Sequence, residues 1–402
     1  MKNLLLIILS LILSLILFII LISCSSEEKV IKNEIDFWHF WSEPSQKKAL
    51  QEIINKFQNE TGIKIKTTEL SWNDGKTKLF TAFNSGIGPD ALELGSDWVS
   101  QFSSSGVLSE IPDSLAKMDS YLDFAKAPSF WNNKIYALPW LVDTRMLFVN
   151  KDIIANTPDS WEEILDILIN KNIYSNKKSG IYLIGQNGPD ANRLYKKIIS
   201  FIWSAGGGIS DFDSEENIYA LEMYKKLADQ GIVEKQRNLD ELFLKGKLGM
   251  TISGGWLVSK LQNSNVNYQI KEMPELNGQR GVSFAGGEYL AINNSSEKKE
   301  LALKFIKFLT KGGNSLSFCK LINDAGFPSD KEYYNNSFFE QNLAKKKFSI
   351  QLESAQMTPV NKHWFEIQDI LELATERVLY DKMSAEEALT KAKESTNLLI
   401  NR

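Results

Sequence analysis

The hydrophobic pattern after the first thirty residues alternates between strand-like and helix-like periods. Residues 34–41 read as a buried strand, and a helix is predicted to begin at Ser42-Glu43-Pro44 because apolar residues then fall at helical spacing, at Ala49, Leu50, Ile53, Ile54 and Phe57. Thr61-Gly62 ends this helix, and residues 63–66 alternate like a half-exposed strand. A strand, a helix and a strand in this order predict a parallel α/β unit.

The same alternation continues to the C-terminus. Ser160 with Glu163, and Ser384 with Glu387, have the spacing of capping boxes at helix starts. A further helix carries apolar residues on one face from Leu301 to Leu309 and is expected to end at Gly312-Gly313. No repeat of fixed period interrupts this pattern. The predicted fold class is therefore α/β.

The first residues form an apolar run from Leu4 to Ile22, broken only by two serines and followed by Ser23-Cys24. This pattern is typical of a lipoprotein signal peptide, in which the thiol of Cys24 accepts a lipid before cleavage. We therefore expect residues 1–23 to be a signal peptide and residues 24–33 a polar tether. The alternative is a transmembrane helix, because the run approaches the ~20 residues that span a bilayer.

Composition narrows the function classes. If Cys24 is acylated, Cys319 is the only other cysteine, so no internal disulfide is expected. Two histidines and no usable cysteine pair leave a zinc or transition-metal site without ligands. We expect no cofactor. A net charge of -4 argues against a nucleic-acid partner. The 10 Trp, 12 Tyr and 22 Phe give a heavy aromatic load, and flat aromatic faces suit the C–H faces of sugar rings.

Several segments, in order along the chain, resemble the family 1 extracellular solute-binding proteins, the maltose-binding-protein-like group. They are residues 36–42 (DFWHFWS), 57–62 (FQNETG), 88–90 (GPD) with 106–108 (GVL), 136–139 (YALP) with 148–152 (FVNKD), 157–163 (TPDSWEE), 243–256 (FLKGKLGMTISGGW) and 284–292 (FAGGEYLAI). Val149 replaces the tyrosine usual in this family. The resemblance covers nearly the whole chain after the tether.

This resemblance implies a two-lobe periplasmic binding protein fold of type II, with a ligand cleft between hinge-linked lobes. The expected N-terminal lobe comprises residues 33–143 and 285–328, and the C-terminal lobe residues 144–284 and 329–402. Hinges are expected near Asp143-Thr144, near Phe284-Ala285 and around Ser329. Such lobes close on their ligand, because binding shifts a population toward the closed form.

The resemblance also implies a function and its partners. The chain would be a monomeric substrate-binding lipoprotein of an ABC importer, exported to the periplasm or cell exterior and held to the membrane by a lipid at Cys24. It would bind a mono- or oligosaccharide and deliver it to the permease subunits without breaking a bond. It would not be an enzyme.

Candidate ligand residues occur first where strands end, because parallel α/β sheets bind ligands at the carboxyl ends of their strands. Trp41 would stack on a sugar, and Ser42 and Glu43 would accept its hydroxyl groups, or these residues only pack and cap the helix. By resemblance, Asp97 faces the sugar, with a simple helix cap as the alternative. Trp98 beside it is either a contact or a core residue.

Other candidates follow from the resemblance to later segments. Asp143 matches an acidic sugar ligand of the family, and Arg145 either donates to ligand or forms a buried ion pair with Asp143. Trp256, after two glycines, would form an aromatic wall of the cleft. Gly286 and Glu288 lie on the returning strand, where Glu288 either faces the cleft or is a solvated charge. Trp203 and Trp364 are possible platforms in helical patterns that equally fit the core.

Two rival functions remain open. A secreted glycoside hydrolase could use Asp97, Asp143 and Glu288 as paired carboxylates, but no nucleophile elbow, P-loop or dinucleotide fingerprint is present. An adhesin or other structural surface lipoprotein would bind without closure. Within the solute-binding family, a glycerol phosphate derivative is an alternative ligand, but it requires a more basic cleft than acidic candidates with Arg145 provide.

Overall fold

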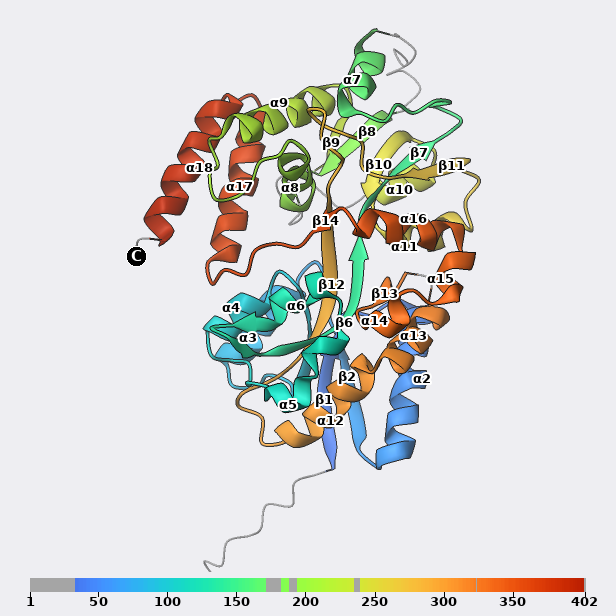
Figure 1. Ribbon diagram of the computed structural model, residues 1–402, viewed down its shortest axis with the longest axis vertical. Helices are drawn as coiled ribbons and strands as arrows, with labels where there is room; N and C mark the ends of the chain where they lie inside the picture. The colour runs from blue at the N-terminus through green and yellow to red at the C-terminus, as the bar shows by residue number, and fades with distance from the viewer. Residues whose placement is uncertain (1–32, 171–181, 188–193, 235–238, 323, 401–402) are drawn as a thin grey trace, which may run out of the picture. The chain divides into compact units, whose positions relative to one another are not determined.

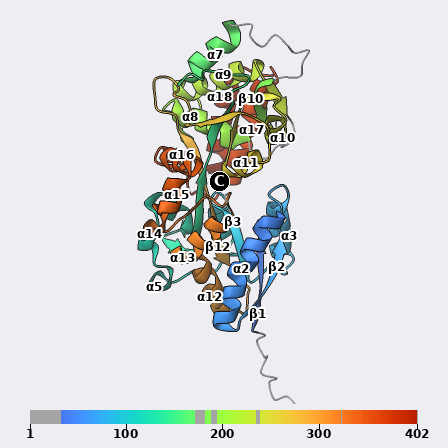
Figure 2. The same ribbon diagram turned by 90° about the vertical axis from the view of Figure 1, so that its right-hand side faces the viewer.

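The computed structural model describes residues 33–170, 182–187, 194–234, 239–322 and 324–400 (Figures 1 and 2). The predicted signal peptide, Cys24 and all of the tether except Asn33 lie outside these residues. None of the helices within the described ranges has the length and apolar character needed to span a bilayer.

The predicted strand–helix–strand unit is present near the start of the described chain. Strand β1 (Glu34–His39) pairs in parallel with β2 (Lys64–Glu69), and helix α2 (Pro44–Thr61) connects them. The five apolar residues at helical spacing are all buried. Gly62 has a φ of 71°, a left-handed conformation that favours glycine, and its N–H closes the helix on the carbonyl of Gln58.

The larger sheet has seven strands and includes β1, the first strand of the described chain. Its order is β13, β6, β12, β3, β1 and β2, with β14 paired to β12. Strand β12 is antiparallel to β6 and β3, whereas β1 is parallel to β2 and β3. The strands not yet given are β3 (Ala91–Gly95), β6 (Ala137–Thr144), β12 (Ser283–Ile292), β13 (Phe327–Pro328) and β14 (Ala355–Gln356).

The smaller sheet has five strands in the order β11, β7, β10, β8, β9. They are β7 (Met146–Asn150), β8 (Tyr182–Asn187), β9 (Ile232–Glu234), β10 (Leu248–Ser253) and β11 (Tyr268–Lys271). Strand β10 pairs antiparallel with β7 and parallel with β8. A separate two-stranded ribbon joins β4 (Phe130–Trp131) to β5 (Lys134–Ile135).

Helices cover both sheets. Besides α2, the α-helices in the described ranges are α3 (Gly75–Asn84), α4 (Val99–Ser104), α5 (Asp113–Ala116), α6 (Asp123–Lys126), α7 (Trp161–Asn170), α8 (Leu194–Ser204), α9 (Glu215–Asp229), α10 (Leu239–Leu244), α11 (Gly255–Leu261), α12 (Lys299–Thr310), α13 (Gly312–Leu321), α14 (Lys331–Tyr334), α15 (Ser337–Gln341), α16 (Leu343–Leu352), α17 (Trp364–Leu379) and α18 (Ala385–Ile400). Strands and helices alternate as the sequence predicts.

Segments distant in sequence build the core of the larger sheet. Helices α12 and α13 lie beside α2 (Figures 1 and 2). The ring of Phe305 on α12 lies 5.1 Å from those of Phe37 on β1 and Phe57 on α2. All three side chains are buried, and burying each contributes roughly 1.5–3 kcal/mol to folding.

Helices α8, α9, α17 and α18 pack against one another and form a second group of helices (Figure 1). Phe201 of α8 lies 4.8 Å from the ring of Trp161 and 5.0 Å from that of Tyr224 on α9. These aromatic contacts fix α8, which carries residues of the candidate site described below.

Helix boundaries agree with the predicted signals except at one point. The N–H groups of Glu163 and Glu387 donate to the hydroxyl groups of Ser160 and Ser384, at 3.2 and 3.1 Å, so one half of each capping box is present. Helix α12 does end before Gly312, but Gly312 begins α13. A bend follows α12 because Lys311 adopts an extended backbone conformation between the two helices.

The chain passes between the sheets near two of the three predicted hinges, after Thr144 and before Phe284. Strand β6 of the larger sheet ends at Thr144, and β7 of the smaller sheet starts at Met146. Thr144 pairs with Ala285 near the start of β12. The hydroxyl group of Ser329 donates to the carbonyl of Pro139 on β6, and α14 packs beside β13 and α13. The predicted lobe boundaries themselves stay a prediction.

Gly326, just before β13, provides a test of this connection. Its φ is +72°, and a Cβ there would lie 2.4 Å from the carbonyl oxygen of Val142 on β6. Gly86 is the matched control, since its φ is +69° but a Cβ would have nothing within 4 Å. We expect Gly86→Ala to lower the free energy of unfolding by about 1–2 kcal/mol from backbone strain alone.

Gly326→Ala should lower it by roughly 1–3 kcal/mol more, because the new methyl group must displace β6. Urea unfolding followed by circular dichroism measures both values. If both variants lose the same free energy of unfolding, Gly326 does not lie as close to β6 as the structure indicates.

Candidate functional site

The candidate site is a cavity of about 390 Å³. Its walls are formed by the ends of strands of the larger sheet and by helices α8 and α11. These helices follow β8 and β10 of the smaller sheet along the chain. The lining residues are Phe40, Trp41, Ser42, Glu43, Gln46, Ser71, Trp72, Asn73, Gly95, Ser96, Asp97, Asp143, Arg145, Lys196, Trp256, Lys260, Phe284, Gly286, Gly287, Glu288 and Asp324. Nine of the twelve candidate ligand residues are among them.

The first wall comes from the end of β1. Glu43 is the N-cap of α2, and its backbone N–H donates to the side chain of Gln46 at 3.1 Å. Trp41 is 7% exposed, with its ring edge-on to Trp140 at 6.0 Å and to Phe318 at 5.0 Å. The capping and packing roles are therefore real, and these residues line the cavity as well.

Asp97 follows β3 and is 5% exposed. Its Oδ2 accepts a short hydrogen bond from the hydroxyl group of Tyr195, and the Nζ of Lys196 lies 3.5 Å away. Burial alone would raise the pKa of Asp97, but Lys196 and the Tyr195 hydroxyl outweigh burial and hold this pKa below its ordinary value. Asp97 is therefore an ionised group with partners of its own on α8.

Asp143 and Arg145 form an ion pair at the end of β6, as one of the two sequence interpretations expected. The Nη1 of Arg145 lies 3.7 Å from Oδ2 of Asp143, and the two side chains are 12% and 22% exposed. The guanidinium group also lies 4.7 Å from the ring centre of Trp256 and 5.4 Å from that of Phe284. Arg145 thus joins an acidic group to two aromatic faces of the cavity.

Trp256 lies at the start of α11. Its indole N–H donates to Oδ2 of Asp240 at 2.8 Å, which orients the ring. A Cβ on Gly254 would lie 2.0 Å from the ring of Trp256, so only glycine leaves room for the indole there. This packing explains the glycine at position 254 but not the one at 255, where a Cβ would have nothing within 4 Å.

The floor of the cavity is β12. Gly286 lies opposite Asp143 on β6, and Glu288 lies opposite Gly95 on β3. A Cβ on Gly286 would lie 2.5 Å from Oδ1 of Asp143, so the missing side chain makes space for this carboxylate. Glu288 faces the cavity and is not a fully solvated charge.

Three predicted tryptophans do not line this cavity. Trp98 packs against Phe40 and Trp72, at 5.6 and 5.3 Å between ring centres. Trp203 on α8 is 9% exposed, and Trp364 at the start of α17 is fully buried, 6.0 Å from the ring of Tyr195. All three serve the core, so the core alternative is the one that the structure supports.

Sequence reasoning missed several lining residues. Ser71, Trp72 and Asn73 follow the end of β2, so the rule that identified Trp41 at the end of β1 also applies to them. Lys196 and Asp324 come from segments without a strand-end signal. Only the folded chain brings them to the cavity.

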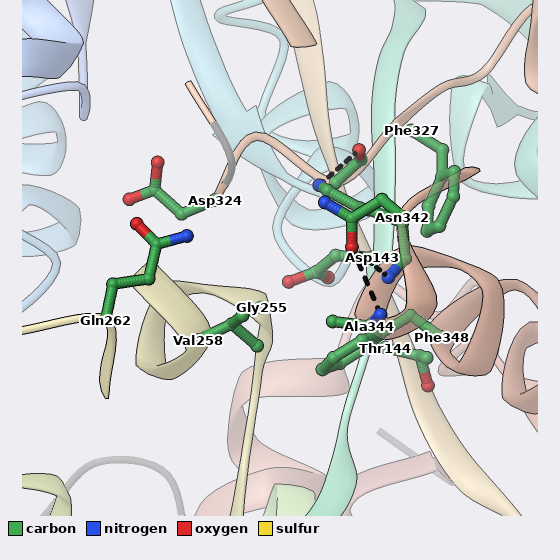
Figure 3. Close-up of a pocket in the computed structure, with 12 residues that line it drawn as sticks. Asp143, Thr144, Gly255, Val258, Gln262, Asp324, Phe327, Asn342, Ala344 and Phe348 are labelled. Atoms are coloured by element: carbon green, nitrogen blue, oxygen red, sulfur yellow. Dashed lines mark hydrogen bonds between the residues drawn. The ribbon is translucent and has the colours of Figure 1, made fainter. Parts of the chain in front are cut away.

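A smaller pocket of about 20 Å³ adjoins the cavity and shares Asp143 and Asp324 with it (Figure 3). Figure 3 shows Gln262 and Asp324 on one side and Asn342 on the other, where Asn342 caps α16 by accepting the N–H groups of Ala344 and Lys345 at 3.1 Å. This volume holds about one water molecule. It is too small for a sugar ring, so the larger cavity is the candidate site.

The chemistry of the cavity is that of binding to polar solutes. Within the described ranges, no group of three or more His, Cys, Asp or Glu side chains has the arrangement of a metal site. The cavity instead combines aromatic rings with acidic and basic side chains, several of them already in ion pairs. Such a lining offers stacking faces and hydrogen-bond partners to a polyhydroxylated ligand.

Comparisons with known proteins agree with this description. The galactooligosaccharide-binding protein of Bacillus subtilis is 24% identical, over 88% of this chain and 87% of its own. The maltooligosaccharide ABC transporter solute-binding lipoprotein of Streptococcus pneumoniae R6 is 25% identical, over 65% of each chain. The GacH receptor of Streptomyces glaucescens has a TM-score of 0.81 at 20% identity, over 92% of this chain and 98% of its own.

The structural similarity confirms the predicted α/β periplasmic binding protein fold. The model of the family described as bacterial extracellular solute-binding proteins matches residues 41–315. This match spans more than half of the chain and confirms the predicted resemblance, including a function in binding and not in catalysis. The chain belongs to the bacterial extracellular solute-binding proteins.

Proposed function

We propose that this protein binds a neutral mono- or oligosaccharide in the cavity and delivers it unchanged to the permease of an ABC importer. The proposal rests on one observation. Two tryptophans and three carboxyl groups line the same cavity, namely Trp41, Trp256, Asp97, Asp143 and Glu288. Aromatic faces stack on sugar rings, and carboxyl groups bond to hydroxyl groups. The curated relatives are described as binding galactooligosaccharide and maltooligosaccharide, and the GacH structures include complexes with acarbose.

Charge pairing favours a neutral ligand over a glycerol phosphate derivative. Arg145 pairs with Asp143, and Lys196 lies beside Asp97. A phosphate group would have to compete with these carboxylates for Arg145 and Lys196, and Lys260 is the lining cation without an ion pair in the described chain. Neutral hydroxyl groups can bond to the existing ion pairs without separating them.

Closure of two lobes over the sugar belongs to the same proposal. Residues 33–143 with 285–328 would move against residues 144–284 with 329–402, and bound sugar would stabilise the closed state that the permease recognises. The passage of the chain from β6 to β7 within two residues supports a hinge at Asp143-Thr144. The proposed protein acts as a monomer.

A titration with a glycan panel tests the proposed ligand class. The full-length chain, in a detergent without a sugar head group, is titrated with neutral sugars and with glycerol phosphates while tryptophan fluorescence is recorded. Saturable binding of a neutral sugar that is recovered intact by chromatography is the expected result. Binding of glycerol phosphates alone, or cleavage of the sugar, would reject the proposal.

Trp256→Ala is expected to weaken sugar binding at least tenfold, because loss of the aromatic wall costs about 1.5 kcal/mol or more. Calorimetric titration of folded protein measures this change. The control is Trp131→Ala, which removes a partly exposed tryptophan outside the cavity and should leave affinity within twofold. Unchanged affinity in Trp256→Ala would remove Trp256 from the site.

The lipid anchor is proposed from the lipobox and from the related lipoprotein of Streptococcus pneumoniae. Cys24→Ser removes the thiol that accepts the lipid, so the variant should incorporate no labelled fatty acid and should remain a precursor or become soluble. Cys319→Ser is the control and should be labelled normally, because Cys319 is a buried free cysteine. Lipid labelling of Cys24→Ser would contradict the anchor.

A further inference from the structure

Glu288 lies among several other carboxyl groups on one face of the larger sheet. Strand β12 lies between β6 and β3, and Asp143 of β6 pairs with Gly286, two residues before Glu288. On β3, Gly95 lies opposite Glu288, and Glu93 is the diagonal neighbour on the same face. Because side chains alternate along a strand, Asp143, Glu288 and Glu93 all point to this face.

Gly286 on β12 and Gly95 on β3 both lie next to Glu288, and a carboxylate occupies the space that each missing side chain leaves. A Cβ on Gly286 would lie 2.5 Å from Oδ1 of Asp143, and a Cβ on Gly95 would lie 2.9 Å from Oδ1 of Asp97. Each carboxylate therefore lies over the glycine next to Glu288, one along β12 and the other across from it. Glu288 has an acidic neighbour on both sides.

The cations near this face are already paired with those neighbours. Arg145 lies 3.7 Å from Asp143, and Lys196 lies 3.5 Å from Asp97. No ion pair to Glu288 or Glu93 occurs among the residues that the structure describes. Adjacent buried carboxyl groups do not all ionise without compensating cations.

We propose that Glu288 carries a proton at neutral pH and acts on the sugar as a hydrogen-bond donor, selecting ligands that place an acceptor oxygen over β12. This inference rests on the proposed function, because it assigns a role within the same sugar site. A ring oxygen, a glycosidic oxygen or a hydroxyl oxygen can accept such a bond. An ionised glutamate would instead require a hydroxyl group that donates.

The electrostatics of the surrounding groups agree with a neutral Glu288. Burial, followed by the neighbouring carboxyl groups of Asp143 and Glu93, raises the pKa of Glu288 well above its ordinary value, against the opposing effect of Arg145. Burial also raises the pKa of Glu93 to about 8, although its Oε2 accepts the N–H of Phe40. The titratable and charged groups around Glu288 are Asp143, Arg145, Glu93, Asp97, Lys196, Tyr289 and Cys319. Helix α16, which packs against β12 and β6, adds Lys345, whose Nζ donates to the carbonyl of Gly326.

Glu93 supports the same interpretation from behind the cavity. It is fully buried, and its Oε1 has no hydrogen-bond partner. An ionised oxygen without a partner is costly in a buried position. With Glu93 also protonated, the remaining negative charges of this face are those of Asp143 and Asp97, each beside its own cation.

Substitution of Glu288 distinguishes a donor from an ionised acceptor. Glu288→Gln keeps a neutral side chain with donor groups, and Glu288→Leu removes the hydrogen bond. With the full-length chain and the sugar that binds best in the panel, calorimetry should give an affinity within threefold of wild type for Glu288→Gln and at least tenfold weaker for Glu288→Leu. The exposed Glu52→Gln on α2 is the control and should match wild type.

A loss of tenfold or more in Glu288→Gln, with its fold intact, would show that Glu288 binds as an ionised acceptor and would overturn the inference. The proposed function would survive this result, because wild type would still bind sugar. A second measurement needs no ligand. Infrared spectra at pH 7 should contain the C=O stretch of a protonated carboxyl group, and part of this band should disappear in Glu288→Gln; an identical band in both proteins would also overturn the inference.

Discussion

Carboxyl groups crowd one face of β6, β12 and β3, and the ion pairs formed there set the character of the cavity. Asp143 has Arg145 and Asp97 has Lys196, whereas Glu288 and Glu93 lie between them without such a partner in the described chain. Because burial penalises uncompensated charge, Asp143 and Asp97 are each compensated by a cation before ligand arrives. Paired charges of this kind suit a neutral ligand with many hydroxyl groups, and the aromatic rings of Trp41 and Trp256 supply further contact surface.

The fold makes this crowding possible. Strand β12 returns from the smaller sheet and inserts antiparallel between β6 and β3, so it brings Gly286 and Glu288 beside residues that are distant in sequence. Gly95 and Gly286 have no side chains, and this leaves room for the carboxylates of Asp97 and Asp143. Helix α8, fixed by the aromatic packing of Phe201, presents Tyr195 and Lys196 to Asp97. The site therefore depends on contacts between elements of both sheets.

Local sequence signals predicted the elements better than the connections between side chains. The helical spacing of residues 49–57 and the end of α2 at Gly62 follow from local chemistry, and so does the placement of Trp41 at a strand end. The same signals could not place Lys196 or Asp324, because their positions depend on tertiary packing. They also could not separate exposed from buried tryptophans, and Trp364 and Trp203 proved to be core residues. The partners of Asp97 became visible only when α8 was in place.

We propose that a neutral sugar occupies the cavity between these rings and carboxyl groups and leaves it chemically unchanged. A crystal structure of the chain with its best-binding sugar would locate this ligand. We expect an intact sugar ring beside Trp256, with Glu288 within hydrogen-bond distance of a sugar oxygen. A ligand bound elsewhere on the protein, or a cleaved sugar in the cavity, would rule out the proposed binding.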